Sequence, residues 1–210
     1  MKNLGQEIAT RGRRLTEEAP HFRVVGAVTV DFCLVLNRPE MLFGRIWPVF
    51  CRAGGADVLL DLLQPFILND RLKSLPKQVF QLMVKHYINT NRHNDLEQII
   101  LHLDVNSMDS SQILALSQEY GLYEAIIHAH ITKKPKANFA APIRTMYLAI
   151  SAPETTKLQT AQKTRLPPKY LILLYAKRCM EGRRYPSLII DGQKQQALAI
   201  AQVLSVIFER

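Results

Sequence analysis

Side chains that could do chemistry are scattered along this sequence rather than gathered into one motif. Asp57 and Asp61 lie four residues apart in a helical pattern, which would place two carboxylates on one helix face, as general acid–base chemistry requires. The sequence indicates no third group beside them, so we interpret them as an exposed acidic face. Ser110 and Ser111 follow Asp109, and a helix N-cap explains that cluster. We therefore predict that the protein is not an enzyme.

Residues that could bind a metal or a cofactor are equally dispersed. Of the six histidines, His128 and His130 are two residues apart and would point to different faces of a helix. His86 and His93 could share a face, but His93 falls in a predicted turn. The nine glycines are scattered and form neither a phosphate-binding loop nor a dinucleotide fingerprint. We predict no metal and no cofactor.

The cysteines indicate a reducing compartment. There are three, each within an apolar pattern: Cys33, Cys51 and Cys179. An odd number of cysteines within apolar patterns predicts buried free thiols. Because the sequence has no C-x-x-C pair, it predicts no zinc ribbon and no RING finger. The first residues lack the apolar run of a secretory signal, and the most apolar stretch, residues 24–36, is too short to span a bilayer. We expect a soluble, cytoplasmic chain whose membrane contacts are peripheral.

The distribution of charge is the strongest functional signal. Residues 133–184 contain twelve Lys or Arg and two acidic residues, a formal charge of +10, whereas the rest of the chain carries 15 basic and 16 acidic residues. Such a segment suits acidic lipid headgroups, an acidic partner helix or nucleic acid, and a solvated linker would also explain it. Basic and aromatic residues do not interleave regularly, which disfavours nucleic acid. The candidate basic surface comprises Lys133, Lys134, Lys136, Lys169, Lys177, Arg178, Arg183 and Arg184.

Helical periodicity runs through the elements that carry these residues. Residues 75–131 contain four stretches whose apolar groups recur every three or four positions, with short polar turns between them. Pro76 suits a first helical turn, Asn94 with Glu97 resembles a capping box, and Gly121 suits a left-handed turn between helices. Short helices cannot bury an apolar stripe alone. We therefore predict an all-α fold, an α-solenoid of stacked antiparallel helix pairs similar to clathrin heavy-chain repeats.

Prolines and glycines divide the remaining chain. We expect a polar helix over residues 1–18, a buried helix over residues 22–36, and a helix opened by Pro39 that Pro48 kinks or splits. A further helix should be bent or broken at Pro65, and a weaker one over residues 139–150 should be interrupted near Pro142.

Three regions follow from this pattern. Residues 1–150 are predicted to form solenoid helix pairs, residues 151–168 a flexible basic loop, and residues 169–210 further helices that continue the solenoid.

Two runs of core and turn residues carry a family likeness. The first comprises Pro65, Phe66, Ile67, Asn69, Asp70, Leu75 and Pro76. The second comprises His102, Leu103, Asp104, Ser107, Met108, Asp109, Gly121, Leu122 and Tyr123. Together they resemble the central region of the vacuolar protein sorting-associated protein 8 family, over roughly residues 28–131.

The resemblance implies a scaffold segment of CORVET, an endosomal membrane-tethering complex. Its implied partners are other class C vacuolar sorting subunits and an early-endosomal Rab-family GTPase, the latter through parts of the family that this sequence does not contain. The family also has a β-propeller and a RING-type domain, so we expect this sequence to be a middle segment. Two alternatives stay open: a generic helical-repeat adaptor whose basic third docks an acidic peptide, and an RNA-binding helical repeat.

Overall fold

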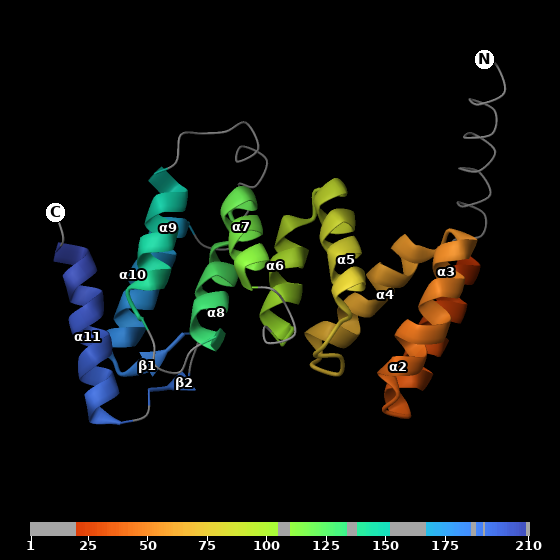
Figure 1. Ribbon diagram of the computed structural model, residues 1–210, viewed down its shortest axis with the longest axis horizontal. Helices are drawn as coiled ribbons and strands as arrows, with labels where there is room; N and C mark the ends of the chain where they lie inside the picture. The colour runs from red at the N-terminus through yellow and green to blue at the C-terminus, as the bar shows by residue number, and fades with distance from the viewer. Residues whose placement is uncertain are drawn as a thin grey trace, which may run out of the picture. The chain divides into compact units, whose positions relative to one another are not determined.

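Helices account for most of the described chain, and they pack side by side within two compact units (Figure 1). A computed structural model describes residues 20–104, 110–133, 138–151, 167–185, 188–190 and 192–208. The units are Met1–His86 and Tyr87–Arg210. The predicted all-α class of stacked helices is confirmed. The helix predicted over residues 1–18 lies outside the described residues, as does most of the loop predicted over residues 151–168.

The first unit contains a helix over residues 20–35, then α2 (Pro39–Met41), η1 (Leu42–Ile46), α3 (Trp47–Ala53), α4 (Ala56–Leu68) and most of α5 (Lys77–Asn89). α2, η1 and α3 form one continuous helical segment, and η1 is a π-helical turn just before Pro48. Proline has no N–H to donate to the helical ladder, so the hydrogen-bonding pattern changes there. The helical segment is therefore not split at Pro48, and its irregularity is the π turn that precedes this residue.

The helix over residues 20–35 is buried on one side only. Gly26 lets it approach α4 closely, because a Cβ at this position would lie 2.6 Å from Leu62 Cδ1. Phe22 packs on Phe50 of α3 with ring centroids 5.7 Å apart. The opposite face exposes large apolar side chains, which are Val24, Val25, Val28, Phe32 and Val35. The prediction of a buried helix was wrong for this face, because the described elements of the unit cover only the side that carries Gly26, Val30 and Cys33.

Two other prolines disturb their helices less than expected. α4 runs through Pro65 without a break and ends three residues later, at Leu68. The interruption predicted near Pro142 is absent. α9 (Ala141–Ser151) begins one residue earlier, so Pro142 occupies the first turn, where a missing N–H removes no intrahelical bond.

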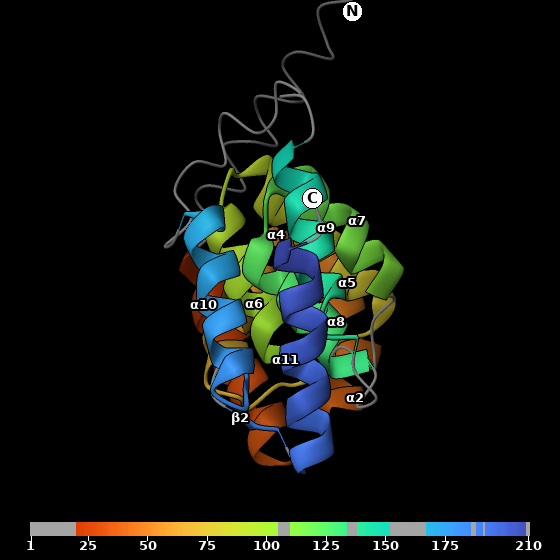
Figure 2. The ribbon, with the colours of Figure 1, turned by 90° about the vertical axis from the view of Figure 1, so that its left-hand side faces the viewer.

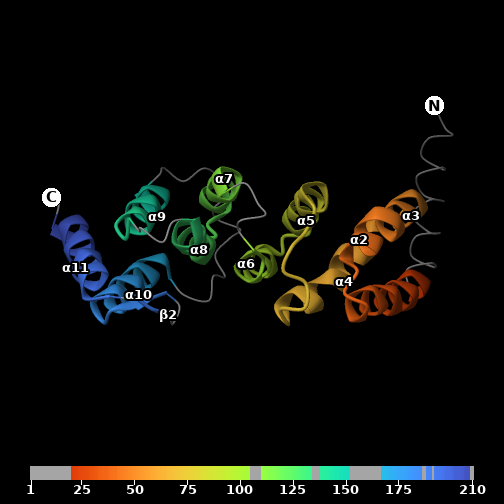
Figure 3. The same cartoon turned by 60° about the horizontal axis from the view of Figure 1, so that its bottom comes forward.

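The second unit continues with α6 (His93–His102), α7 (Ser110–Tyr120), α8 (Tyr123–Lys133), α9, α10 (Pro168–Met180) and α11 (Gln193–Phe208). α7 and α8 lie side by side (Figure 3) and are joined through Gly121, whose φ of 68° confirms the predicted left-handed turn. α9, α10 and α11 pack on one another (Figure 2). Their core includes Met146, Tyr175 and Val203, all nearly inaccessible to solvent.

A short strand pair follows α10 and was not predicted. β1 (Arg183–Arg184) pairs antiparallel with β2 (Leu188–Ile189), with Arg183 opposite Ile189. Gly182, with a φ of 70°, ends the helix, and its carbonyl accepts a hydrogen bond from the Ile190 N–H at 2.9 Å. Two-residue strands carry no periodicity, so sequence patterning could not reveal them.

Side-chain hydrogen bonds fix the beginning of α9. Asn138 Oδ1 accepts from the N–H groups of Ala140 (3.2 Å) and Ala141 (3.1 Å), as a helix cap does. The Phe139 N–H donates to Gln202 Oε1 of α11 at 2.8 Å, and the Tyr175 hydroxyl of α10 donates to the Phe139 carbonyl at 3.1 Å. One residue thus ties α9 to both neighbouring helices.

The Tyr175 bond gives a test of this packing. We expect Tyr175→Phe to lower the free energy of unfolding by about 1–2 kcal/mol, because it leaves the buried Phe139 carbonyl without this donor. Tyr147→Phe is the matched control, since the Tyr147 side chain is exposed on α9. Chemical denaturation of both variants measures the difference. Equal effects of the two substitutions would contradict the assigned role.

Candidate functional site

His86 bridges the two carboxylates that sequence spacing places on one face. His86 of α5 lies 3.1 Å from Asp61 Oδ1 through Nε2 and 3.4 Å from Asp57 Oδ1 through Nδ1. The Asp57 side chain is largely exposed, whereas that of His86 is mostly buried. The predicted acidic face of α4 is confirmed for Asp57, and the structure adds a partner from the next helix. Sequence spacing could not show this, because the contact joins residues 25 positions apart.

No three of the remaining histidines and cysteines come together as a group that could hold a metal ion in the described part of the chain. His93 begins α6 rather than lying in a turn, and its ring stacks on Tyr120 with centroids 5.4 Å apart. His130 Nε2 lies 3.0 Å from Thr145 Oγ1 and links α8 to α9. Burial lowers the pKa of both imidazoles. Cys51 is exposed, so the prediction of a buried thiol was wrong at that position, because Cys51 lies on the outer face of α3.

Within the described ranges no group of three or more His, Cys, Asp or Glu side chains could hold a metal ion. None of the described helices is long and apolar enough to cross a membrane.

Glu97 is the most perturbed acidic group described. It lies on α6, yet its side chain caps a different helix: Oε1 accepts from the N–H groups of Glu124 (2.8 Å) and Ala125 (3.3 Å), at the beginning of α8. The predicted capping box of Asn94 with Glu97 was therefore wrong. α6 has Arg92 at its N-cap position, without a side-chain cap, and Glu97 faces the neighbouring helix instead.

The environment of Glu97 shifts its acidity strongly. Burial raises the pKa of its carboxyl from an ordinary 4.5 to about 7, the Glu124 carboxylate adds to the increase, and the two backbone hydrogen bonds oppose it. Burial raises the pKa of Tyr185, which follows β1, to about 12, with the charges of Glu124 and Glu97 adding to the effect and Arg178 opposing it. Two acids and a phenol therefore meet where α6, α8 and β1 approach one another.

This acidic cluster is built for packing rather than for access to a substrate. Glu97 is 6% exposed, and the oxygen that forms its hydrogen bonds is committed to the amides of α8. A carboxyl group that supplies acceptors to a helix N-terminus satisfies donors that the helix itself leaves unbonded. The cluster therefore joins α6 to α8 and places their apolar stripes in register.

Four residues of the candidate basic surface have described side chains, and they lie on α10 and β1: Lys169, Lys177, Arg178 and Arg183. Lys169 lies in the first turn of α10, and Lys177 lies about two turns further along the helix. The helical rise separates the two positions by about 12 Å along the helix axis. Lys177 Nζ and Arg178 Nη1 lie 3.9 Å and 3.5 Å from the Glu181 carboxylate, which compensates part of their charge. Arg183 is exposed on β1.

Arg184 is on β1 and Lys133 ends α8, but their side chains are not described. Lys134 and Lys136 lie outside the described residues.

Stacked short helices with buried cross-helix hydrogen bonds define this chain as a helical-repeat protein. Residues 58–210 match the family described as Vps8 central TPR. The chain therefore belongs to the vacuolar protein sorting-associated protein 8 family, through its central helical-repeat region. The resemblance noted in the sequence is confirmed, and the match extends to the last residue, well beyond residue 131.

Curated relatives agree with this assignment. The chain is 29% identical over 168 residues to the mouse vacuolar protein sorting-associated protein 8 homolog, and equally to the human homolog, with 79% of this chain covered. It is 20% identical over 148 residues to vacuolar protein sorting-associated protein 8 of Saccharomyces cerevisiae. The chain spans only 12% of the length of the mouse and human relatives. No solved structure gives a significant match.

The raised pKa of Glu97 predicts a dependence of stability on pH. Between pH 4.5 and about 7 the folded chain keeps a proton that the unfolded chain has released, so the free energy of unfolding falls as pH rises through this range. The expected loss from this group is on the order of 3 kcal/mol and is complete above pH 7. Glu97→Gln keeps an acceptor oxygen and removes the charge. We expect the variant to match the wild type near pH 5 and to exceed its stability at pH 8.

Urea denaturation of both chains at several pH values between 5 and 8 measures the difference. Glu119→Gln, an exposed substitution on α7, is the matched control and should change stability by less than about 0.5 kcal/mol at every pH. A Glu97→Gln difference that does not vary with pH would refute the assigned titration.

Proposed function

We propose that this chain is a non-catalytic scaffold segment of an endosomal membrane-tethering complex of the CORVET type, acting in vesicle-mediated protein transport and endosome fusion. The observation that carries the proposal is the family match over residues 58–210, which falls on the stacked helices α4–α11. A helical repeat exposes extended surfaces and keeps them at fixed spacing, which suits a tether. The proposed location is cytoplasmic and peripheral on endosomal membranes.

The proposed partners are other class C vacuolar sorting subunits. An early-endosomal Rab-family GTPase would belong to the full complex and would be bound outside this segment, because the resemblance brings no GTPase-contacting residue into this chain. The curated relatives carry vacuolar protein sorting in their names, which supports the sorting role. Tethering and the individual partners are inferences from the family resemblance.

Co-purification tests the proposal directly. The protein carrying this segment is tagged in its native cells, isolated from endosomal membranes with and without RNase, and its companions are identified. We expect class C vacuolar sorting subunits in both preparations. Their absence would reject the tethering role in favour of a generic helical-repeat adaptor, and an assembly that RNase disperses would favour an RNA-binding repeat.

The basic residues on α10 and β1 are the proposed electrostatic contact with acidic partners, including anionic membrane. Lys169, Lys177 and Arg183 are exposed, and Glu181 compensates only part of the charge of Lys177 and Arg178. Near an anionic bilayer each basic residue contributes about 1 kcal/mol, and salt screens the attraction.

Charge reversal at these three positions tests the contact. We expect the triple variant K169E/K177E/R183E to bind phosphatidylserine-containing vesicles at least roughly 100-fold more weakly than the wild type at low salt. The triple variant K73E/K77E/K85E changes the same number of exposed charges in the first unit and should bind nearly as the wild type does. Vesicle binding that is absent in the wild type at low salt, or equally weakened in both variants, would remove the proposed membrane contact.

A further inference from the structure

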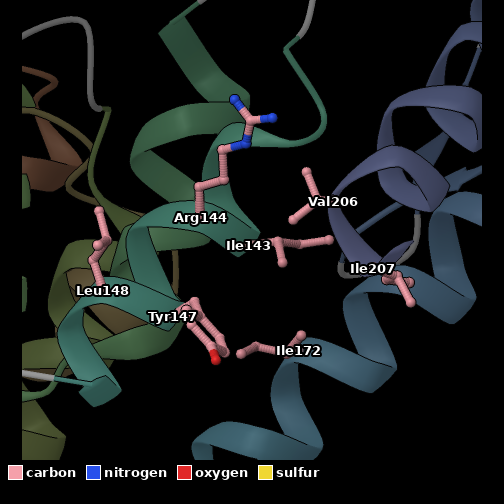
Figure 4. Close-up of a pocket in the computed structure, with 7 residues that line it drawn as sticks. All are labelled: Ile143, Arg144, Tyr147, Leu148, Ile172, Val206 and Ile207. Atoms are coloured by element: carbon pink, nitrogen blue, oxygen red, sulfur yellow. The ribbon is translucent and has the colours of Figure 1, made fainter. Parts of the chain in front are cut away.

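A hollow of about 500 Å³ opens among three helices of the second unit (Figure 4). Ile143 of α9, Ile172 of α10 and Val206 of α11 line its inner part, and Ile143 is almost completely buried. Tyr147 and Leu148 of α9 line it further out, together with Ile207 of α11. These three side chains are 66%, 67% and 47% exposed. The result is an apolar groove with a solvent-accessible rim.

The walls of the groove are held in place before anything binds. The backbone of Phe139 is hydrogen-bonded to Gln202 of α11 and to Tyr175 of α10, which fixes the beginning of α9 against both neighbours. Met146, on the inner side of α9, is completely buried in the core. A preformed groove binds without the entropy cost of ordering its own walls.

The lining has the composition of a protein-binding surface. Exposed apolar residues are common singly, but a cluster of them around a hollow is not. Tyrosine and arginine are the side chains that contribute most at protein interfaces, and this groove has Tyr147 and Arg144 on adjacent turns of α9. Among the lining residues Arg144 is the only charged one, so little is present to orient a small polar metabolite.

The charge of the surrounding helices is entirely of one sign. Within their bounds α9, α10 and α11 contain no Asp or Glu. Their basic residues are Arg144, Lys169, Lys177, Arg178 and Lys194. A partner that presents acidic groups beside an apolar face therefore meets complementary charge, whereas a basic partner is repelled.

We propose that this groove binds an amphipathic helix of a partner protein, whose apolar face fills the hollow and whose flanking Asp or Glu pairs with Arg144. The helices of this unit already pack by laying one apolar stripe against the next, and an incoming helix beside α9 would extend the same packing. Its anchors would recur at positions i, i+3 or i+4, and i+7, which matches the Ile143–Tyr147 spacing on α9.

A display library provides the probe. Helical peptides of about 18 residues carry fixed Leu anchors at the spacing above, and their flanking positions are randomised among Asp, Glu, Lys, Arg, Ser and Ala. The library is selected on the 210-residue chain and counter-selected on Y147A. We expect enriched peptides to have acidic flanks. Y147A should weaken their Kd at least about tenfold, because an aromatic anchor is lost.

Matched variants make the result specific. Y170A removes an exposed tyrosine of α10 that does not line the groove. Y170A should leave Kd within about twofold. R144E should weaken the binding of the acidic peptides and strengthen the binding of copies in which Glu is replaced by Lys.

Three outcomes would overturn the proposal: no enrichment over an unrelated immobilised protein, enrichment of basic peptides, or binding that Y147A leaves unchanged. Vesicles of phosphatidylserine and phosphatidylcholine form a parallel arm, and Y147A-sensitive vesicle binding without peptide enrichment would assign the groove to membrane instead.

The proposal does not depend on tethering. Peptide binding without class C subunits would reject only the tethering role, and the reverse result would reject only the groove.

Discussion

An apolar stripe on a short helix has to be covered by another helix, and everything else in this protein depends on that constraint. α8 shows it most clearly. Ile126 and Ile127 are completely buried, although the helix has only eleven residues, because α6, α7, α9 and α10 all pack against it. An isolated helix of that length is marginal in water. Each helix of the unit is therefore stabilised chiefly by its neighbours, and the order of the stack follows from tight turns such as the one at Gly121.

Polar side chains of one helix form hydrogen bonds with backbone groups at the ends of neighbouring helices. Glu97 accepts from the first amides of α8, Gln202 accepts from the amide of Phe139 before α9, and Tyr175 donates to the carbonyl of the same residue. Helix ends leave backbone groups without intrahelical partners, so these bonds satisfy groups that would otherwise be buried at a cost. They also fix how far one helix can slide along the next. The raised pKa of Glu97 is a consequence of placing a carboxyl in that position.

The protein presents its functional features as surface, and the two units do so differently. In the first unit, one face of the helix over residues 20–35 exposes Val28 and Phe32 while the other packs on α3 and α4. In the second unit, an apolar groove lies among helices that contain only basic charged residues. Such faces are typical of helical repeats that assemble with other proteins. Membership of a vacuolar protein sorting family is consistent with assembly with other proteins.

The sequence alone determined the all-α class, the helix-ending role of Gly121 and the family, because periodicity, turn residues and core motifs are local signals. It could not determine which side of residues 20–35 is covered, since an apolar run looks the same whether or not a neighbour packs on it. Nor could it show Glu97 capping α8, His86 between two aspartates, or the groove beside Tyr147. Each of these joins residues from different helices, and only tertiary packing decides which helices meet and at what depth.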